Sequence, residues 1–242
     1  MKRYIFAGLL VFLVSVAAFA PAGLISRNVN NLNADIALLD PRGTIWNGQA
    51  NVIATGESIG QLTWQLSPIS LLLLSPSADW QLTGTNIGLS GTISGISQIN
   101  TNTKGELDLA LLTPLFNRYD MAVPGMVTLQ DVEFEIDTNA QLVTAADGYL
   151  EWSGGQVRYI LSGILSETLL PKMRANLSAP NQIPTAEVFA EGEPVRLIHA
   201  QITREGFIKI GITKMFTKLL NRPWPGSDPD HAVVLEVEEQ LL

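Results

Sequence analysis

Most of the chain alternates apolar and polar residues with a period of two, the pattern of half-buried β-strands. In residues 61–67, Leu62, Trp64 and Leu66 alternate with polar residues until Pro68 ends the run. Comparable runs lie at 80–82, 87–93, 107–111, 132–136, 208–212 and 233–237. The pattern predicts a mainly β fold of antiparallel strands in a curved sheet or a sandwich-like arrangement, with one face covered and the other in water.

The parity of the apolar positions changes between Leu129 and Val132. A strand can keep both runs on one face only if an extra residue is inserted, which predicts a β-bulge near Gln130 or Asp131.

Two stretches depart from the period of two and predict one or two short helices. In residues 160–170 the apolar residues recur at helical spacing until Pro171, although Gly163 opposes a helix. Residues 213–220 fit better, because one helical face is apolar and Pro223 ends the run. The apolar face would carry Met215, Phe216, Leu219 and Leu220, and the opposite face Lys214 and Lys218.

The N-terminal residues 4–25 form an apolar stretch in which Ser15 is the only strongly polar side chain. As a helix at about 1.5 Å per residue it would be about 33 Å long, enough to cross a hydrocarbon core of about 30 Å. Residues 1–25 are therefore predicted to be a cytoplasmic tip and one transmembrane helix, and residues 26–242 a β-rich domain. Lys2 and Arg3 before the span, against Arg27 alone just after it, favour a cytoplasmic N-terminus.

A cleavable signal peptide is the alternative, because Ala18, Phe19 and Ala20 have the small-x-small pattern of a cleavage site. We favour a retained anchor, because the apolar stretch exceeds the usual signal core and Pro21 would follow the cut. Both alternatives export the residues after the stretch. A second apolar run at 69–74 is too short to span a membrane.

The formal net charge of −8 argues against binding to nucleic acid. The chain has no cysteine, which excludes disulfides, thiol catalysis and zinc–thiolate sites. His199 and His231 are its only histidines, and neither belongs to a metalloprotease motif; nucleophile-elbow and phosphate-loop motifs are absent as well. We therefore expect no catalytic residues, no metal and no cofactor, and the protein is not expected to be an enzyme.

Four carboxylates would share one face of the strand predicted around 132–136. They are Asp131, Glu133, Glu135 and Asp137. Alternate residues of a strand stand about 7 Å apart, so a neighbouring pair could bind Ca²⁺ or resemble a glycosidase pair. We favour a solvated face or a sheet edge blunted by charge.

Five tryptophans could form a binding platform, but three of them alternate with aliphatic residues and are predicted to pack in the core. Those three are Trp64, Trp80 and Trp152. Trp46, in a glycine-flanked turn, and Trp224, between two prolines, are the candidates for partner contacts.

Two sequence elements after the apolar stretch form a more specific pattern. Residues 39–50 read LDPRGTIWNGQA and residues 59–68 read IGQLTWQLSP. The first supplies Gly43, Thr44, Trp46 and Gly48, and the second Gly60, Leu62, Trp64 and Pro68. In order and spacing the chain resembles protein N of the bacterial type II secretion system, the general secretory pathway protein N family.

The resemblance implies a single-pass protein of the bacterial inner membrane with its main domain in the periplasm. It would be an accessory of the machinery that exports folded proteins across the outer membrane, and its partners would be other inner-membrane subunits of that system. The glycine-punctuated strands also resemble periplasmic proteins of the AsmA type, which makes a lipid-handling or envelope-biogenesis module, with lipid as partner, the alternative. A hydrolase of envelope glycans is a minor third hypothesis.

Overall fold

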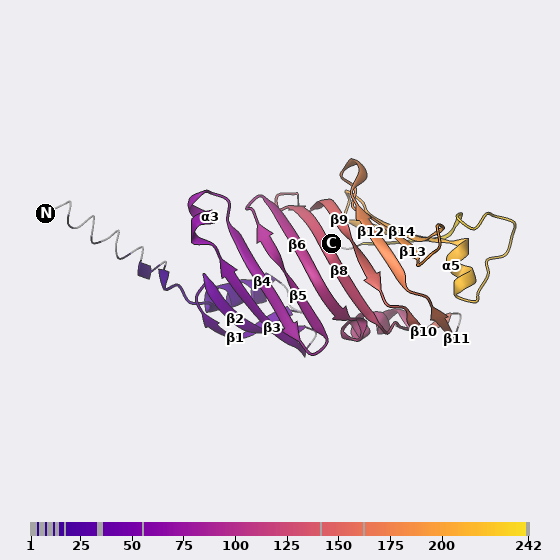
Figure 1. Ribbon diagram of the computed structural model, residues 1–242, viewed down its shortest axis with the longest axis horizontal. Coiled ribbons are helices and arrows are strands. Elements are labelled where there is room, and N and C mark those ends of the chain that lie inside the picture. Colours follow the sequence, from indigo (N-terminus) through magenta and orange to yellow (C-terminus); the bar gives the residue numbers. More distant parts are fainter. Residues whose placement is uncertain are drawn as a thin grey trace. The chain divides into compact units, whose positions relative to one another are not determined.

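The computed structural model describes residues 18–32, 36–54, 56–140, 142–161 and 163–240, together with five residues before them (Figure 1). Those five are Tyr4, Gly8, Phe12, Ser15 and Val16. None of the helices that these residues form has the length and apolarity of a membrane span. Of the predicted span, residues 4–25, nine residues lie outside the described part of the chain. The chain divides into unit 1, Met1–Thr85, and unit 2, Asn86–Leu242. The described end of the span belongs to unit 1, because Pro21 forms a bridge with Thr44 and residues 23–25 begin the helix α2 (Gly23–Leu32).

Unit 1 is an antiparallel meander with one apolar face under a helix. Its strands follow one another in the order β1 (Ile36–Gly43), β2 (Asn47–Ala54), β3 (Glu57–Leu66) and β4 (Ser77–Gly84). Its helices are α2 (Gly23–Leu32) and the short α3 (Pro68–Leu72), which Pro68 begins. The α2 helix covers a core cluster of Ala22, Leu38, Ala50 and Trp64. The predicted strand at 61–67 is the second half of β3.

Unit 2 contains a larger antiparallel meander and a small second sheet. The large sheet runs in the order β5 (Ile87–Ser94), β6 (Gln98–Asp108), β8 (Met126–Asp137), β9 (Leu142–Trp152), β12 (Met173–Ser178), β13 (Thr185–Ala190), β14 (Arg196–Ile202), β15 (Phe207–Thr213) and β16 (Val233–Gln240). The small sheet has the order β11 (Ile164–Leu170), β10 (Gly155–Leu161), β7 (Met121–Ala122). Short helical turns are η1 (Leu109–Leu112), α4 (Thr113–Phe116), η2 (Asn117–Tyr119), η3 (Pro180–Gln182) and α5 (Lys214–Leu219). The prediction of a mainly β, antiparallel fold with few short helices is confirmed.

The predicted bulge lies in β8. Gln130 pairs with Tyr149, whereas the next paired residue, Glu133, faces Asp147. Asp131 has a φ of 45°, and a Cβ added to Gly148 would lie 2.4 Å from the Asp131 carbonyl oxygen. The bulge is how β8 keeps its two apolar runs on the same face of the sheet.

The helix predicted over residues 160–170 is wrong. This segment is the β10–β11 hairpin, which turns at Gly163 with a φ of 76°. The outward face of the hairpin is apolar too, with Ile160, Leu165 and Leu169 exposed. Because both faces carry aliphatic residues, the period of two is lost and a false helical spacing results.

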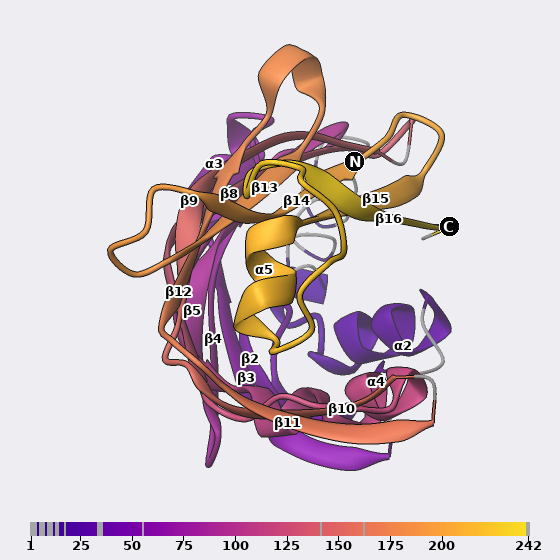
Figure 2. The same ribbon diagram turned by 90° about the vertical axis from the view of Figure 1, so that its right-hand side faces the viewer.

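The second predicted helix exists as α5. Met215, Phe216, Leu219 and Leu220 pack against a core cluster that includes Met173, Ala190 and Leu197. Lys214 differs from the prediction of an outer face, because it is buried and its Nζ donates to the carbonyl oxygens of Gly226 (2.7 Å) and Asp228 (2.8 Å). Figure 2 shows α5 between the β14–β15 part of the large sheet and the β10–β11 sheet. This part of unit 2 is therefore sandwich-like.

Candidate functional site

The turn between β1 and β2 binds residues 20–22, which lie near the end of the N-terminal apolar stretch of residues 4–25. The amide of Ala22 donates to the Gly43 carbonyl (3.1 Å), and the amide of Ile45 donates to the Ala20 carbonyl (3.0 Å). Pro21 forms an antiparallel bridge with Thr44. Residues 20–22 are thus held like a short extra strand against the turn. We call residues 43–48 together with Trp64 the socket.

The glycines of the socket are required by close contacts. A Cβ added to Gly48 would lie 2.5 Å from Cζ2 of Trp64, because the indole ring packs directly on the glycine backbone. At Gly43, with a φ of 85°, an added Cβ would lie 2.5 Å from the Asn47 carbonyl oxygen. Any larger residue would separate the turn from the ring.

The remaining motif residues lie in the β1–β2 turn, along β3 and at the start of α3. Trp64 is 8% exposed, and its Nε1 donates to the Ile45 carbonyl at 3.2 Å. The Thr44 hydroxyl accepts from the amides of Trp46 (3.3 Å) and Asn47 (3.2 Å). Gly60 lets β3 and β4 approach each other, because an added Cβ would lie 2.5 Å from the Thr83 carbonyl oxygen. Leu62 packs against the core cluster, and Pro68 begins α3.

The two tryptophans predicted as partner contacts belong to different units. Trp46 is partly buried at the socket, and its carbonyl accepts from the Leu66 amide at 2.7 Å. Trp224 is 41% exposed in the loop after α5, where its amide donates to the Thr217 hydroxyl at 3.2 Å. Trp224 is the better candidate for an external contact.

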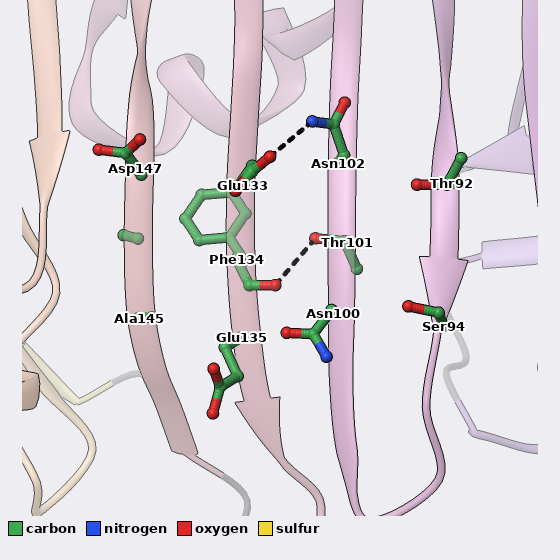
Figure 3. Close-up of a pocket in the computed structure, with 11 residues that line it drawn as sticks. Thr92, Ser94, Asn100, Thr101, Asn102, Glu133, Phe134, Glu135, Ala145 and Asp147 are labelled. Carbon is green, nitrogen blue, oxygen red and sulfur yellow. Dashed lines mark hydrogen bonds between the residues drawn. The ribbon is translucent and has the colours of Figure 1, made fainter. Parts of the chain in front are cut away.

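The acidic strand is β8, and its carboxylates belong to a polar face of the unit 2 sheet (Figure 3). The strand register aligns Thr92, Asn102, Glu133 and Asp147 in one row, and Ser94, Asn100, Glu135 and Ala145 in the next. The side-chain amide of Asn102 donates to Oε1 of Glu133 at 2.9 Å. These residues line a shallow pocket of about 300 Å³.

The prediction that this strand is a sheet edge is wrong, because β8 pairs with β6 on one side and β9 on the other. The carboxylates of β8 reach solvent from the face of the sheet.

The four carboxylates also have different surroundings. The Asp137 carboxylate accepts from the amides of Asn139 (2.8 Å) and Ala140 (3.0 Å), and Asp131 occupies the bulge. Across the described part of the chain, no group of three or more acidic or histidine side chains could hold a metal ion.

Asp147 and Asn102 were missed by reasoning from the sequence, although they complete this polar face. Each lies on a strand whose pairing with β8 follows from the tertiary register. Alternation alone could have put Asn102 on a polar face, but it could not put it opposite Glu133.

A second polar cluster lies on β9 and β12. Arg174 Nη2 is 2.6 Å from Oε1 of Glu151, and Lys172 Nζ is 3.4 Å from Oε2. The hydrogen bond from Arg174, supported by the charge of Lys172, lowers the pKa of Glu151 and outweighs the opposing effect of desolvation. The guanidinium of Arg174 also lies 4.5 Å from the centroid of the Tyr149 ring. The cluster joins adjacent strands, which indicates a structural role.

His199 has a structural setting on β14. Its Nδ1 lies 3.7 Å from Oε1 of Glu187, the carboxylate that also pairs with Arg196. No nucleophilic side chain is hydrogen-bonded to it among the described residues. The geometry offers no acid–base pair here.

The family model for type II secretion system (T2SS), protein N, matches residues 34–218. The chain belongs to the T2SS protein N family. The match begins just before β1 and ends within α5, so it includes the socket, both polar clusters and most of unit 2. No curated protein and no solved structure matches the chain.

Membership identifies the protein as a type II secretion system component, and the T2SS protein N family is not a known enzyme family. The family resemblance seen in the two sequence elements is thereby confirmed. Five of the eight motif residues build the socket; they are Gly43, Thr44, Trp46, Gly48 and Trp64.

Proposed function

We propose that the protein is an accessory inner-membrane component of the type II machinery that exports folded proteins from the periplasm across the outer membrane. The observation that carries the proposal is the match to T2SS protein N over residues 34–218. In this proposal the N-terminus faces the cytoplasm, the apolar stretch is a retained anchor, and both units lie in the periplasm. The asymmetry of Lys2 and Arg3 against Arg27 supports that orientation.

The socket supports a role in which the anchor positions the fold. Residues 20–22 are bonded to the β1–β2 turn, and Ala22 and Ile25 pack on the sheet of unit 1. The predicted anchor, residues 4–25, overlaps this segment and would therefore lead into the sheet of unit 1 without a flexible linker. Such a linkage suits a subunit that must present its sheets to neighbours at a fixed height above the membrane.

The expected partners are other inner-membrane subunits of the secretion system, bound through the sheet faces and exposed contacts such as Trp224. The family match favours this role over the AsmA-like alternative, because it assigns the chain to a secretion component. An accessory role requires no catalytic activity of the protein.

The topology is tested with full-length fusions in a bacterium that has the secretion system. A C-terminal alkaline phosphatase should be active and a C-terminal green fluorescent protein dark, and intact mass should show that the N-terminal stretch is retained. A mature protein that begins near Pro21 would contradict the anchor, and an active fluorescent fusion would contradict export.

The assembly is tested by cross-linking in intact cells followed by purification of the full-length protein. Inner-membrane subunits of the secretion system should co-purify, and Trp224→Ala should reduce their recovery without unfolding the protein. Recovery equal to that with an unrelated single-span protein would contradict the accessory role.

A further inference from the structure

The loop between β3 and β4, residues 67–76, presents apolar side chains to solvent. Ile69 is 69% exposed, Leu71 37%, Leu73 74% and Leu74 84%. Isolated exposed aliphatic residues are ordinary on a protein surface, but four within six residues form a patch that calls for a ligand.

The patch is unusual in composition as well. From Leu66 to Ala78 the sequence contains only leucine, isoleucine, alanine, serine and proline, without a single charged residue. The chain as a whole carries a net charge of −8. This segment could approach an anionic lipid surface without bringing a carboxylate to it.

The loop is held by its own hydrogen bonds. The Ser70 hydroxyl donates to the Ser67 carbonyl (2.7 Å) and accepts from the Ser77 amide (3.0 Å). The amide of Ser67 donates to the Ser77 carbonyl (2.9 Å), and the amide of Ser75 donates to the Ser70 carbonyl (2.9 Å). The Ser70 side chain thus bonds within the loop, whereas Ile69, Leu71, Leu73 and Leu74 are exposed. A loop whose backbone groups are hydrogen-bonded within the loop brings few unpaired polar groups into an apolar environment. The free-energy cost of entering that environment is therefore low.

The loop also lies at the end of the sheet where the N-terminal segment enters. The amide of Leu66, just before the loop, donates to the Trp46 carbonyl at 2.7 Å, and the neighbouring Ile45 amide donates to Ala20. The α3 helix therefore follows the end of β3 that adjoins the socket (Figure 1). A bilayer crossed by the residues before Ala20 would meet this same end of unit 1.

We propose that residues 67–76 form a second membrane contact, in which Ile69, Leu73 and Leu74 insert into the interface of the bilayer that holds the anchor. Two attachments, the anchor and the loop, fix the tilt of the unit 1 sheet, whereas the anchor alone would leave it free to rotate. The inference rests on the proposed anchoring, because only the anchor brings the loop to the lipid.

The lack of cysteine allows a clean test in the full-length protein. Leu73→Cys carries an environment-sensitive fluorophore, and Glu57→Cys is the matched control, because Glu57 is exposed at the opposite end of β3. The two ends of β3, Glu57 and Leu66, stand about 30 Å apart at about 3.3 Å per residue. Both proteins are reconstituted into vesicles of phosphatidylethanolamine and phosphatidylglycerol, with and without nitroxide-labelled lipid.

The probe at position 73 should shift to the blue and lose about half of its emission or more in nitroxide-containing vesicles, while the probe at position 57 changes by less than about a tenth. Flotation of the protein together with the vesicles shows separately whether the anchor holds the protein in the membrane. Proteins that float but are not quenched at position 73 would overturn the inference and leave the anchoring intact, and failure to float would overturn both. A blue shift without quenching by lipid would show a protein contact instead, and would also overturn it.

Discussion

The two helices that cover apolar sheet faces, α2 in unit 1 and α5 in unit 2, are held in different ways. The α2 helix packs through Ile25 and Val29 on a cluster that contains Ala22 and Trp64. Its described side-chain hydrogen bonds to the sheet come from Asn30, which accepts from the Leu38 amide (2.7 Å) and donates to the Leu38 carbonyl (3.3 Å). Apolar contact therefore provides most of its attachment.

The α5 helix depends on buried hydrogen bonds at both of its ends. At the start, the hydroxyl of the fully buried Thr213 lies 2.9 Å from the Arg196 carbonyl oxygen and 3.0 Å from that of Leu197. At the end, Tyr159 donates to the Leu220 carbonyl (2.7 Å) and Thr168 to the Leu219 carbonyl (3.1 Å). The small sheet thus satisfies carbonyls that a helix of six residues leaves unpaired.

The difference shows what each helix needs in order to stay attached to its sheet. A ten-residue helix can present enough apolar area to be held by packing, whereas a short one needs its terminal polar groups bonded before its apolar face can pack. In unit 1 the residue that contributes most to holding the helix should therefore have a large apolar side chain. In unit 2 it should have a small side chain with a hydroxyl group.

The largest effect is expected for Trp64→Ala in unit 1. Loss of the buried ring should lower the free energy of unfolding by about 3–5 kcal/mol, because it leaves a cavity under α2 and empties the socket. Urea unfolding of the full-length protein in detergent, followed by circular dichroism, measures the change.

Amide hydrogen exchange then shows which strands Trp64→Ala destabilises. Exchange should accelerate in β1–β3 and stay unchanged in β12–β15. Trp224→Ala is the control, because that side chain is partly exposed, and it should cost well under half as much. A Trp64→Ala protein with wild-type stability would contradict the packing account of unit 1.

A smaller effect is expected for Thr213→Val in unit 2. The substitution keeps the volume but removes the single hydroxyl proton that the carbonyl oxygens of Arg196 and Leu197 share, which should cost about 1–3 kcal/mol. Thr92→Val, on the exposed polar face, should change stability by less than about 0.5 kcal/mol. If the two substitutions had equal effects, the polar attachment of α5 would be refuted.

The residues explain which features could be predicted. The bulge at Asp131 and the apolar face of α5 depend on local periodicity, and both follow from the sequence. The β10–β11 hairpin was mistaken for a helix because the exposed Ile160, Leu165 and Leu169 remove the alternation that marks a strand.

Features that depend on distant contacts could not be found in this way. The central place of β8 depends on its pairing with β6 and β9. The socket depends on a contact between Gly48 and Trp64 across two strands. The motif residues could be recognised from the sequence, but their joint role in holding residues 20–22 could not.

The smallest effect is expected for Glu151, whose contacts lie within the large sheet of unit 2 and involve neither helix. Arg174 and Lys172 lower the pKa of Glu151 below its ordinary value of 4.5. The folded protein therefore binds this proton less readily than the unfolded chain, so the contribution to stability is present above about pH 4.5 and is lost as the pH falls through the lower pKa of the folded state.

Glu151→Gln should accordingly lower the melting temperature slightly at about pH 6 and converge with the wild type toward about pH 3. Arg174→Gln should reduce the same acid dependence, because it removes the main cause of the shift, and the double variant should add little to either single one. Melting curves across this range provide the measurement. If the difference in melting temperature between Glu151→Gln and the wild type stayed constant with pH, the side chain would contribute to stability through packing and not through its ionisation. Exchange protection of α2 and α5 should be equal in all three variants, since the cluster joins strands of the large sheet of unit 2 and contacts neither helix.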